Sequence, residues 1–401
     1  MKILVLNAGS SSLKYQIFDM PEGEVLTKGM VERIGEPGSG LSQKTPGKND
    51  IEIKRDIPDH ETAIGLVIRA ITDPKDGIIK SLSEVEAIGH RVLHGGEKYA
   101  DSHLVTEDLK AAVEAYSDLG PLHNPANLMG IRAAEHNFPG IPNVAVFDTA
   151  FHQSMPKEAF LYPIPYAYYE EYGIRRYGFH GTSHKYVSGE AARLLGLSPG
   201  EANLITCHLG NGCSIAAIKG GKCADTSMGM TPLEGLMMGT RSGDIDPAIF
   251  AYLSAKTGKS AKEIETVLNK ESGLLGISRI SNDMRALHGK SLEGDEGAIL
   301  AIAMFAYRAR KYVGAYMAVL GRVDAIVFTG GMGEKAEYVR AAILDGMENF
   351  GVEIDPAKNV AELKEAVISK DSSRTKVMVV PTREELVIAR DAYAIVSENN
   401  A

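Results

Sequence analysis

Two arginines stand in surroundings that suit binding of an anion. Arg91 lies near the end of a strand-like stretch, residues 85–94, which is followed by a Gly-Gly pair, and Arg241 lies within the glycine-flanked stretch 239–244. A guanidinium beside glycines can approach an anionic ligand closely, whereas one in a core strand needs a carboxylate partner. An ion pair for Arg91 and a solvated surface position for Arg241 are the alternatives.

A second candidate for anion binding is the stretch 203–219. It predicts a strand, a tight turn at residues 208–212 and a returning strand. Glycines at the tip allow backbone N–H groups to approach phosphate, and His208 and Asn211 can add side-chain donors. An ordinary hairpin turn with an Asn-Gly pair is the alternative.

The same design occurs at the N-terminus. Small residues at 7–12 separate two strand-like runs, and a third run at 24–31 matches the run at 222–226. Two such units about 200 residues apart predict a duplicated chain, with two similar domains that face one phosphate-bearing ligand.

Further elements would position polar side chains around these turns. A buried strand at 144–147 ends in Asp148, where α/β sheets place ligand groups, although an acid that only starts a turn is equally consistent. A second buried strand at 325–329 runs into the glycines at 330–333, whose backbone N–H groups could receive a nucleotide. The Gly331, Gly333 and Ala336 pattern alone is a weak dinucleotide signal.

Helix boundaries follow from capping residues. Asn124 with Pro125 predicts the start of one helix, which leaves His123 in the preceding loop, and Ser183 predicts the start of another. Thr382 with Glu385 predicts a capping box for the last helix, which we expect to pack on the first domain. Residues 37–49 are rich in glycine, serine and proline and predict a surface excursion without regular structure.

Composition limits the class of protein. The chain has 401 residues, 44% hydrophobic and 24% charged, with a net charge of −9. This charge argues against nucleic-acid or membrane-surface partners. The three cysteines cluster within one repeat without metal-ligand spacing, which favours reduced core residues. Because no run is long and apolar enough for a membrane span, we expect a cytoplasmic protein.

Taken together, these motifs resemble those of the acetate kinase family over essentially the whole chain. The resemblance rests on the stretches 7–14, 90–91, 121–125, 147–152, 177–184, 208–212, 231–235 and 239–243. It implies an α/β fold with two similar domains of the sugar kinase, Hsp70 and actin (ribonuclease H-like) type and an interdomain cleft. The implied domains are 1–150, joined by the C-terminal helix 385–401, and a nucleotide-binding domain, 151–384.

The resemblance also implies an activity, which is reversible transfer of the ATP γ-phosphoryl group to acetate, giving acetyl phosphate and ADP, in a homodimer. It places Asn7, Asp148 and Glu384 around Mg²⁺, with Mn²⁺ as a possible substitute. The implied catalytic residues are Arg91, His123, Asp148, His180 and Arg241, and the implied acetate pocket comprises Arg91, Leu93, Leu122, Phe179 and Pro232. The implied nucleotide site comprises Ser10, Ser12, Lys14, His208, Leu209, Gly210, Asn211, Gly212, Asp283, Met284, Arg285, Gly331, Met332, Gly333 and Lys335.

The chemistry fits these residue types independently. Acetate is ionised at pH 7, so its oxygen needs no general base, and the obstacle is repulsion between a carboxylate and a polyphosphate. Arginines, a histidine and a divalent cation would neutralise that charge. The chain departs from the family pattern at Arg383 and Lys335, which stand where the family usually has asparagine.

Three other functions share parts of this pattern. A penicillin-recognising serine enzyme is suggested by the stretches 11–14 and 256–258, but the S-D-N element and an export signal are missing and the serine lies in a hairpin turn. An actin-like or Hsp70-like structural ATPase would share the fold, but it has no second anionic substrate that would require Arg91 and Arg241. Propionate or butyrate kinase differs from acetate kinase only in the acyl pocket.

Overall fold

The computed structural model describes residues 1–121, 123–361 and 363–399. The chain packs as two compact units, Met1–Ala150 with Arg383–Ala401 (unit 1) and Phe151–Thr382 (unit 2). The second segment of unit 1 begins at Arg383, two residues before the boundary expected from the sequence. Glu384 therefore lies in unit 1.

Unit 1 is built on an eight-stranded sheet with the strand order β5-β4-β3-β2-β1-β6-β8-β7. Strands β1, β2 and β3 form an antiparallel meander, and β6 and β8 run parallel to β1. The strands are β1 Lys2–Ala8, β2 Ser12–Asp19, β3 Glu24–Glu32, β4 Gly40–Lys44, β5 Ile51–Lys54, β6 Val85–Val92, β7 His103–Leu104 and β8 Asn143–Phe147. The parallel strands are buried, which explains the continuous apolar run at 144–147.

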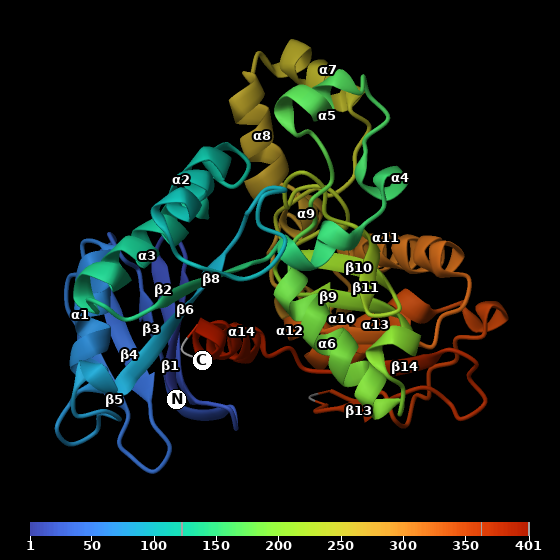
Figure 1. Cartoon of the computed structure of the whole chain (residues 1–401). Helices are drawn as coiled ribbons and strands as arrows, with labels where there is room; N and C mark the ends of the chain where they lie inside the picture. The colour runs from blue at the N-terminus through green and yellow to red at the C-terminus, as the bar shows by residue number, and fades with distance from the viewer. Residues whose placement is uncertain (122, 362, 400–401) are drawn as a thin grey trace. The chain divides into compact units, whose positions relative to one another are not determined.

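Helices cover both faces of this sheet. Ile88 packs in the core that includes α1 (His60–Ile71), whereas a Cβ at the neighbouring Gly89 would meet Ile388 of α14 (Glu384–Asn399). Because adjacent residues of a strand face opposite sides, α1 and α14 lie on opposite faces. Figure 1 shows α14 in red beside β6 and β1, which confirms that the last helix packs on the first domain.

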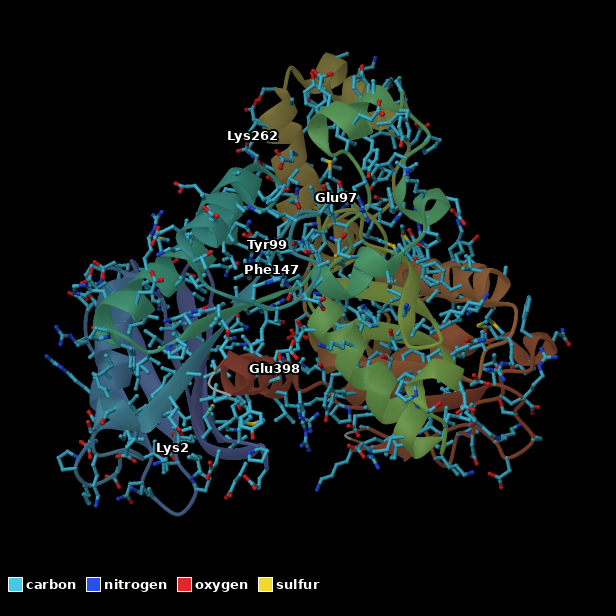
Figure 2. All side chains as sticks on the ribbon, in the orientation of Figure 1. Lys2, Glu97, Tyr99, Phe147, Lys262 and Glu398 are labelled. Carbon is cyan, nitrogen blue, oxygen red and sulfur yellow. The ribbon has the colours of Figure 1, made fainter. Side chains whose placement is uncertain are left out.

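A smaller core lies under helices α2 (Glu107–Ala115) and α3 (Asn124–Asn137). Within it the rings of Tyr99 and Phe147, both labelled in Figure 2, stack with centroids 5.3 Å apart. Phe147 is the last residue of β8, so this packing fixes the end of the strand from which Asp148 follows.

Unit 2 has a six-stranded sheet with the order β11-β10-β9-β12-β14-β13. An antiparallel meander, β9-β10-β11, is followed by strands β12 and β14 parallel to β9. This is the same topology as β1-β2-β3 with β6 and β8, so the predicted duplication is confirmed. The strands are β9 Asn203–Leu209, β10 Cys213–Lys219, β11 Lys222–Thr226, β12 Ala325–Thr329, β13 Ala366–Val367 and β14 Lys376–Val379.

The long helix α11 (Glu296–Leu320) packs against β10 and β9, and α6 (Gly181–Leu194) packs against β9 and β12 (Figure 1). The remaining α-helices of unit 2 are α4 Lys157–Phe160, α5 Ala167–Tyr172, α7 Ala248–Thr257, α8 Ala261–Lys270, α9 Gly273–Ser278, α10 Met284–Leu292, α12 Gly330–Lys335 and α13 Glu337–Leu344.

Four local predictions are wrong. The stretch 37–49 contains β4, which pairs with β3 and buries Leu41. Helix α3 has His123 at its N-cap, so Asn124 lies inside the helix. Helix α6 has His180 at its N-cap rather than Ser183. The hydroxyl of Thr382 makes no hydrogen bond to another described residue, so the capping box with Glu385 does not form.

Tertiary context explains the first three of these differences. Sheet pairing outweighs the weak local preference at β4, and the buried side chains of Asn124 and Ser183 bond to other parts of the fold instead of capping their own helices.

Among the described residues, no helix is long and apolar enough to cross a membrane.

Acid should destabilise unit 1 through His90. This side chain is buried on β6, with Nε2 2.7 Å from Asn143 Oδ1, and burial lowers its pKa to about 4 although the hydrogen bond opposes that shift. In the unfolded chain, histidine takes up a proton near pH 6.5, whereas folded His90 does so only near pH 4. The free energy of unfolding is therefore undiminished above pH 6.5 and falls between pH 6.5 and 4, by up to about 3 kcal/mol.

The matched variant is His90→Gln, which keeps an amide N–H donor for Asn143 but cannot titrate. Urea unfolding followed by circular dichroism should show that wild type loses more stability than the variant between pH 7 and pH 4.5. Equal losses in the two proteins would contradict the role given to His90.

Candidate functional site

Unit 1 contains a small cavity of about 200 Å³ at the ends of β1 and β6. Its wall combines cationic, amide and apolar side chains. The lining residues are Asn7, Ala8, Gly9, Ser12, Lys14, Arg91, Leu93, His123 and Asn127. The turn that joins β1 to β2 closes one side, with Gly9 N donating to Ser12 O at 2.8 Å.

Asn127 of α3 links two backbone segments that line this cavity. Its Nδ2 donates to Ala8 O at 2.7 Å, and its Oδ1 accepts from Leu93 N at 3.0 Å. One buried amide thereby ties the end of β1 to the end of β6. A Cβ added at Gly120 would lie 2.8 Å from Leu93 Cδ2, so one methyl group of Leu93 packs against that glycine.

Arg91 forms an ion-pair group with two carboxylates. Its Nη2 donates to Asp148 Oδ2 at 2.7 Å and its Nε to Asp148 Oδ1 at 3.0 Å, while Nε lies 3.9 Å from Glu384 Oε2. Asp148 is completely buried, and the side chain of Arg91 is 25% exposed. Burial lowers the pKa of Arg91, but the two carboxylates outweigh it and the net direction is upward.

Glu384 carries negative charge that Arg91 does not fully neutralise. Burial, together with Asp148 and Glu385, raises the pKa of Glu384 to about 7 against the opposing effect of Arg91. Its Oε2 is buried and accepts no hydrogen bond from the described residues. A buried carboxylate oxygen without a donor beside a second carboxylate is the environment that a cation relieves.

The donor set fits a hard divalent cation. Asp148 and Glu384 carry the two carboxylates that face Arg91, and Asn7 of β1, whose side chain includes an amide oxygen, lines the cavity together with Arg91. Within the described ranges, no group of three His, Cys, Asp or Glu side chains could hold a metal. Oxygen ligands of this number leave coordination positions for water and phosphate, as Mg²⁺ sites commonly do.

In unit 2, the tip of the β9–β10 hairpin lies beside Arg241 and His180. Leu209 pairs with Cys213, so the tip comprises residues 210–212. A Cβ added at Gly212 would lie 3.3 Å from Arg241 Nη1 and 3.6 Å from His180 Nε2. Glycine therefore leaves open a space that the guanidinium of Arg241 and the imidazole of His180 both border.

Arg241 lacks an acidic partner among the residues described. Its Nη1 donates only to Pro232 O at 3.2 Å and to Met238 Sδ at 3.7 Å, and burial lowers its pKa. A partly buried guanidinium without a carboxylate is costly unless an anionic ligand supplies the charge. The surrounding loop is anchored by Asp244, whose Oδ1 accepts from Gly235 N at 2.8 Å.

His180 is held in an uncommon backbone conformation at the N-cap of α6. Its φ is +58°, a left-handed value that costs a non-glycine residue about 1 kcal/mol or more. Its Nδ1 lies 2.9 Å from Ser214 Oγ, and its ring stacks on His208 with centroids 4.2 Å apart. His208 Nδ1 in turn lies 2.8 Å from Ser183 Oγ.

The candidate nucleotide residues of unit 2 border the same hairpin. Asn211 Oδ1 accepts from Asn282 Nδ2 at 3.3 Å, next to Asp283, which caps α10 and pairs with the exposed Arg285. Arg285 lies in the first turn of α10.

The glycine-rich stretch that follows β12 forms the short helix α12. A Cβ at Gly330 would meet the backbone of Leu209 at 2.9 Å, which packs the start of α12 against β9. The helix also contains Gly331, Met332 and Gly333 and ends at Lys335, which is exposed.

The sequence signature of the acetokinase family matches residues 2–390 of this chain. The chain belongs to the acetokinase family. The acetate kinase of Halothermothrix orenii is 55% identical over 396 residues, which cover 99% of this chain and all of the relative. The chain is therefore an enzyme of the kinase class.

Solved structures of the acetokinase family share the fold. The acetate kinase of Porphyromonas gingivalis superposes with a TM-score of 0.94 at 48% identity, covering 98% of this chain and 99% of that one. A propionate kinase from Francisella tularensis has a TM-score of 0.92 at 44% identity, with the same coverage. The predicted α/β fold with two similar halves is thus confirmed.

For this acetokinase, the structure groups the sequence-predicted residues within each unit. In unit 1, Ser12, Lys14, Leu93 and His123 line the cavity with Asn7 and Arg91, and Ser10 lies exposed in the adjoining turn. In unit 2, Phe179 is buried beside His180, and Pro232 bonds Arg241 through its carbonyl. The side chains of Leu209 and Met284 are buried in the core. Leu122 lies outside the described residues.

Sequence reasoning did not single out Asn127, Ser214 or His184 as site residues. Asn127 carried a signal, because it lies one helical turn from His123 and therefore shares its face. Ser214 carried a weaker one, as a lone hydroxyl in the apolar strand β10. Only the fold shows which histidines it contacts.

Proposed function

We propose that this acetokinase is an acetate kinase, which transfers the γ-phosphoryl group of ATP reversibly to acetate. The observation that carries the proposal is the 200 Å³ cavity of unit 1, which combines the guanidinium of Arg91 and the ammonium of Lys14 with the apolar side chain of Leu93. A cavity of this size and lining suits a short carboxylate, with the charged end at Arg91 and the methyl group at Leu93.

In the proposed reaction an acetate oxygen attacks the γ-phosphorus and forms a new O–P bond. The bond from phosphorus to the bridging oxygen breaks, and its electron pair stays on ADP. No proton moves, since acetate is already ionised. Arg91, Arg241 and His180 would neutralise the charge that accumulates on the transferred group, and His123 would support them.

Mg²⁺ would be held by Asn7, Asp148 and Glu384, with Mn²⁺ as a substitute. The cation would neutralise phosphate oxygens and fix the geometry of transfer. Support comes from the buried oxygen of Glu384, which accepts no hydrogen bond from the part of the chain that the structure describes, and from the nearby carboxylate of Asp148.

The nucleotide would be held by two groups of residues. The phosphates would be bound by Ser10, Ser12 and Lys14 and by the hairpin residues 208–212. Asp283, Met284, Arg285 and the α12 residues 331–333 with Lys335 would line the adenosine site. The N–H groups and side-chain donors available at these turns support this assignment.

A hydroxylamine-trapping assay of acyl phosphate tests the function. The purified protein with Mg-ATP should form acyl hydroxamate with acetate, at a higher kcat/KM than with propionate or butyrate. Absence of acyl phosphate with all three acids would refute the kinase assignment. A preference for propionate would favour the second candidate, propionate kinase, which the likeness to the Francisella tularensis enzyme supports.

The preference of the enzyme for a short acyl chain should depend on Leu93. The side chain is 7% exposed, lines the cavity and already contacts Gly120, so it has little room to retreat from a longer acyl chain. One methylene in an apolar pocket is worth about 1–3 kcal/mol, so acetate should be preferred over propionate by roughly 10-fold or more. Leu93→Val should raise the propionate-to-acetate ratio of kcat/KM. An unchanged ratio would show that residue 93 does not set the size limit.

We also propose a cytoplasmic homodimer without membrane or nucleic-acid partners. The net charge of −9 disfavours polyanionic surfaces. Exposed apolar side chains on α11, Leu300 and Tyr307 among them, offer a surface that a second copy could cover. Light scattering coupled to size exclusion should give twice the chain mass of 43.1 kDa.

A further inference from the structure

Ser214 bridges two histidines in the interior of unit 2. It lies on β10 and is completely buried. Its Oγ is 2.9 Å from His180 Nδ1 and 2.8 Å from His184 Nε2. His184 is also buried, and its Nδ1 lies 2.6 Å from Thr206 Oγ1 on β9. Four side chains thus form a continuous hydrogen-bonded chain, Thr206, His184, Ser214 and His180.

The protons in this chain can be counted. Burial, followed by the neighbouring His152 and His208, lowers the pKa of His184 well below 6.5, so its ring is neutral and carries one N–H. The hydroxyl of Ser214 has one proton to donate. It can donate to His180 Nδ1 while accepting from His184 Nε2, or donate to His184 Nε2 while accepting from His180 Nδ1. Accepting from both rings would leave its buried hydroxyl proton without an acceptor. The two arrangements are mutually exclusive.

Each arrangement assigns a different role to the outer edge of His180. If Ser214 donates to Nδ1, the neutral ring must carry its proton on Nε2. If Ser214 accepts from Nδ1, the neutral ring presents a lone pair at Nε2. Because Nε2 and Arg241 Nη1 both border the space that glycine leaves open at position 212, an anion in that space would be attracted by the first tautomer and repelled by the second.

We propose that Ser214, supported by His184, is a positioning residue that places the proton of His180 on Nε2 and holds the ring in that orientation. The left-handed φ of His180 is consistent with such a constraint, because the conformation needs compensating contacts. Ser214 acts through His180 and not on the substrate. The choice between the two tautomers rests on the proposed function, because it assumes an anion beside Nε2, whereas the contacts of Ser214 with both rings do not depend on it.

The test is histidine ¹⁵N NMR of the ligand-free protein, with the His180 signals assigned from their loss in His180→Gln. Wild type should show the neutral Nε2–H tautomer, and Ser214→Ala should show a mixture of tautomers. The matched control is Ser183→Ala, which removes the serine that contacts His208 Nδ1 and should leave the His180 tautomer unchanged.

Steady-state kinetics provide the second measurement. Ser214→Ala should lower kcat by about 10–100-fold, the range for groups that orient a functional histidine, with KM for acetate changed by less than about threefold. A wild-type His180 protonated on Nδ1 would overturn the proposal, as would the same tautomer in Ser214→Ala as in wild type. The tautomer of His180 in wild type can be measured without the Ser214→Ala variant. The proposal can therefore be tested even if Ser214→Ala does not fold. The tautomer is read without substrate, so failure of the acetate kinase assignment is recognised separately.

Discussion

Arg241→Ala should lower turnover with acetate on the order of 10³-fold without loss of stability. The guanidinium is partly buried, and no carboxylate of the described residues pairs with it, so its desolvation is uncompensated until an anion arrives. Its removal should leave the free energy of unfolding unchanged or raised. A fall in activity therefore cannot be attributed to unfolding.

The companion variant Arg91→Ala should lose activity to a similar degree but for two reasons. Its guanidinium is bidentate to the fully buried Asp148, and removing one partner of a buried pair typically costs about 3–5 kcal/mol. Arg91→Ala should thus reduce both turnover and stability, whereas Arg241→Ala reduces turnover alone.

The measurement is kcat with acetate together with urea unfolding for each variant. The control is Arg132→Ala, which removes an arginine that is 57% exposed and pairs only loosely with Glu114 at 3.4 Å. That variant should match wild type in both assays. Near-normal turnover in Arg241→Ala would show that no charge develops beside this residue in the transition state.

Much of the fold could be predicted because its signals are local. Continuous apolar runs marked the parallel strands at 144–147 and 325–329, and the repeated strand-turn-strand pattern revealed the duplication that the two sheets share. Errors arose where long-range contacts decide the outcome. Strand β4 forms because it pairs with β3, and the composition of residues 37–49 alone does not predict that pairing.

The candidate site divides in the same way. The sequence identifies residues whose type is unusual for their surroundings, such as Arg91 in a strand-like stretch that is followed by a Gly-Gly pair. Their partners cannot, because Arg91 and Asp148 are 57 positions apart and meet only through the parallel pairing of β6 with β8. The same limit explains why Ser214 could not be identified, since its role depends on His184 of α6 and on His180 at the N-cap of that helix.

Glu384→Gln should weaken divalent-cation binding and at the same time stabilise the cation-free protein. The substitution keeps the shape of the side chain and removes a buried charge that lies near Asp148 and Glu385. Loss of one of the two proposed carboxylate ligands should lower the affinity for Mn²⁺, measured by electron paramagnetic resonance with ADP present, by about 10–100-fold. Turnover should fall on the order of 10³-fold, because the cation supplies several kcal/mol of charge stabilisation.

The stability effect has a defined pH range. In the folded protein burial raises the pKa of Glu384 to about 7, above the 4.5 of the free side chain, so the ionised form is disfavoured by folding. The penalty is absent below pH 4.5, grows between pH 4.5 and 7, and is full above pH 7, where it amounts to about 3 kcal/mol at most. Without cation, Glu384→Gln should therefore melt at a higher temperature than wild type at pH 8 and at the same temperature at pH 4.

The variant Glu385→Gln tests whether Glu384 binds the cation directly or only contributes negative charge nearby. Glu385 contributes negative charge near Glu384, but it belongs to no part of the proposed cation site. If long-range charge alone governs cation affinity, the two variants should weaken Mn²⁺ binding equally. If Glu384 is a direct ligand, only Glu384→Gln should show the large loss of affinity. The same concentration of Mg²⁺ should then stabilise Glu384→Gln less than wild type and Glu385→Gln, because stabilisation of the folded state falls as the affinity for the ligand falls. Equal stabilisation of all three proteins by Mg²⁺ would remove Glu384 from the cation site.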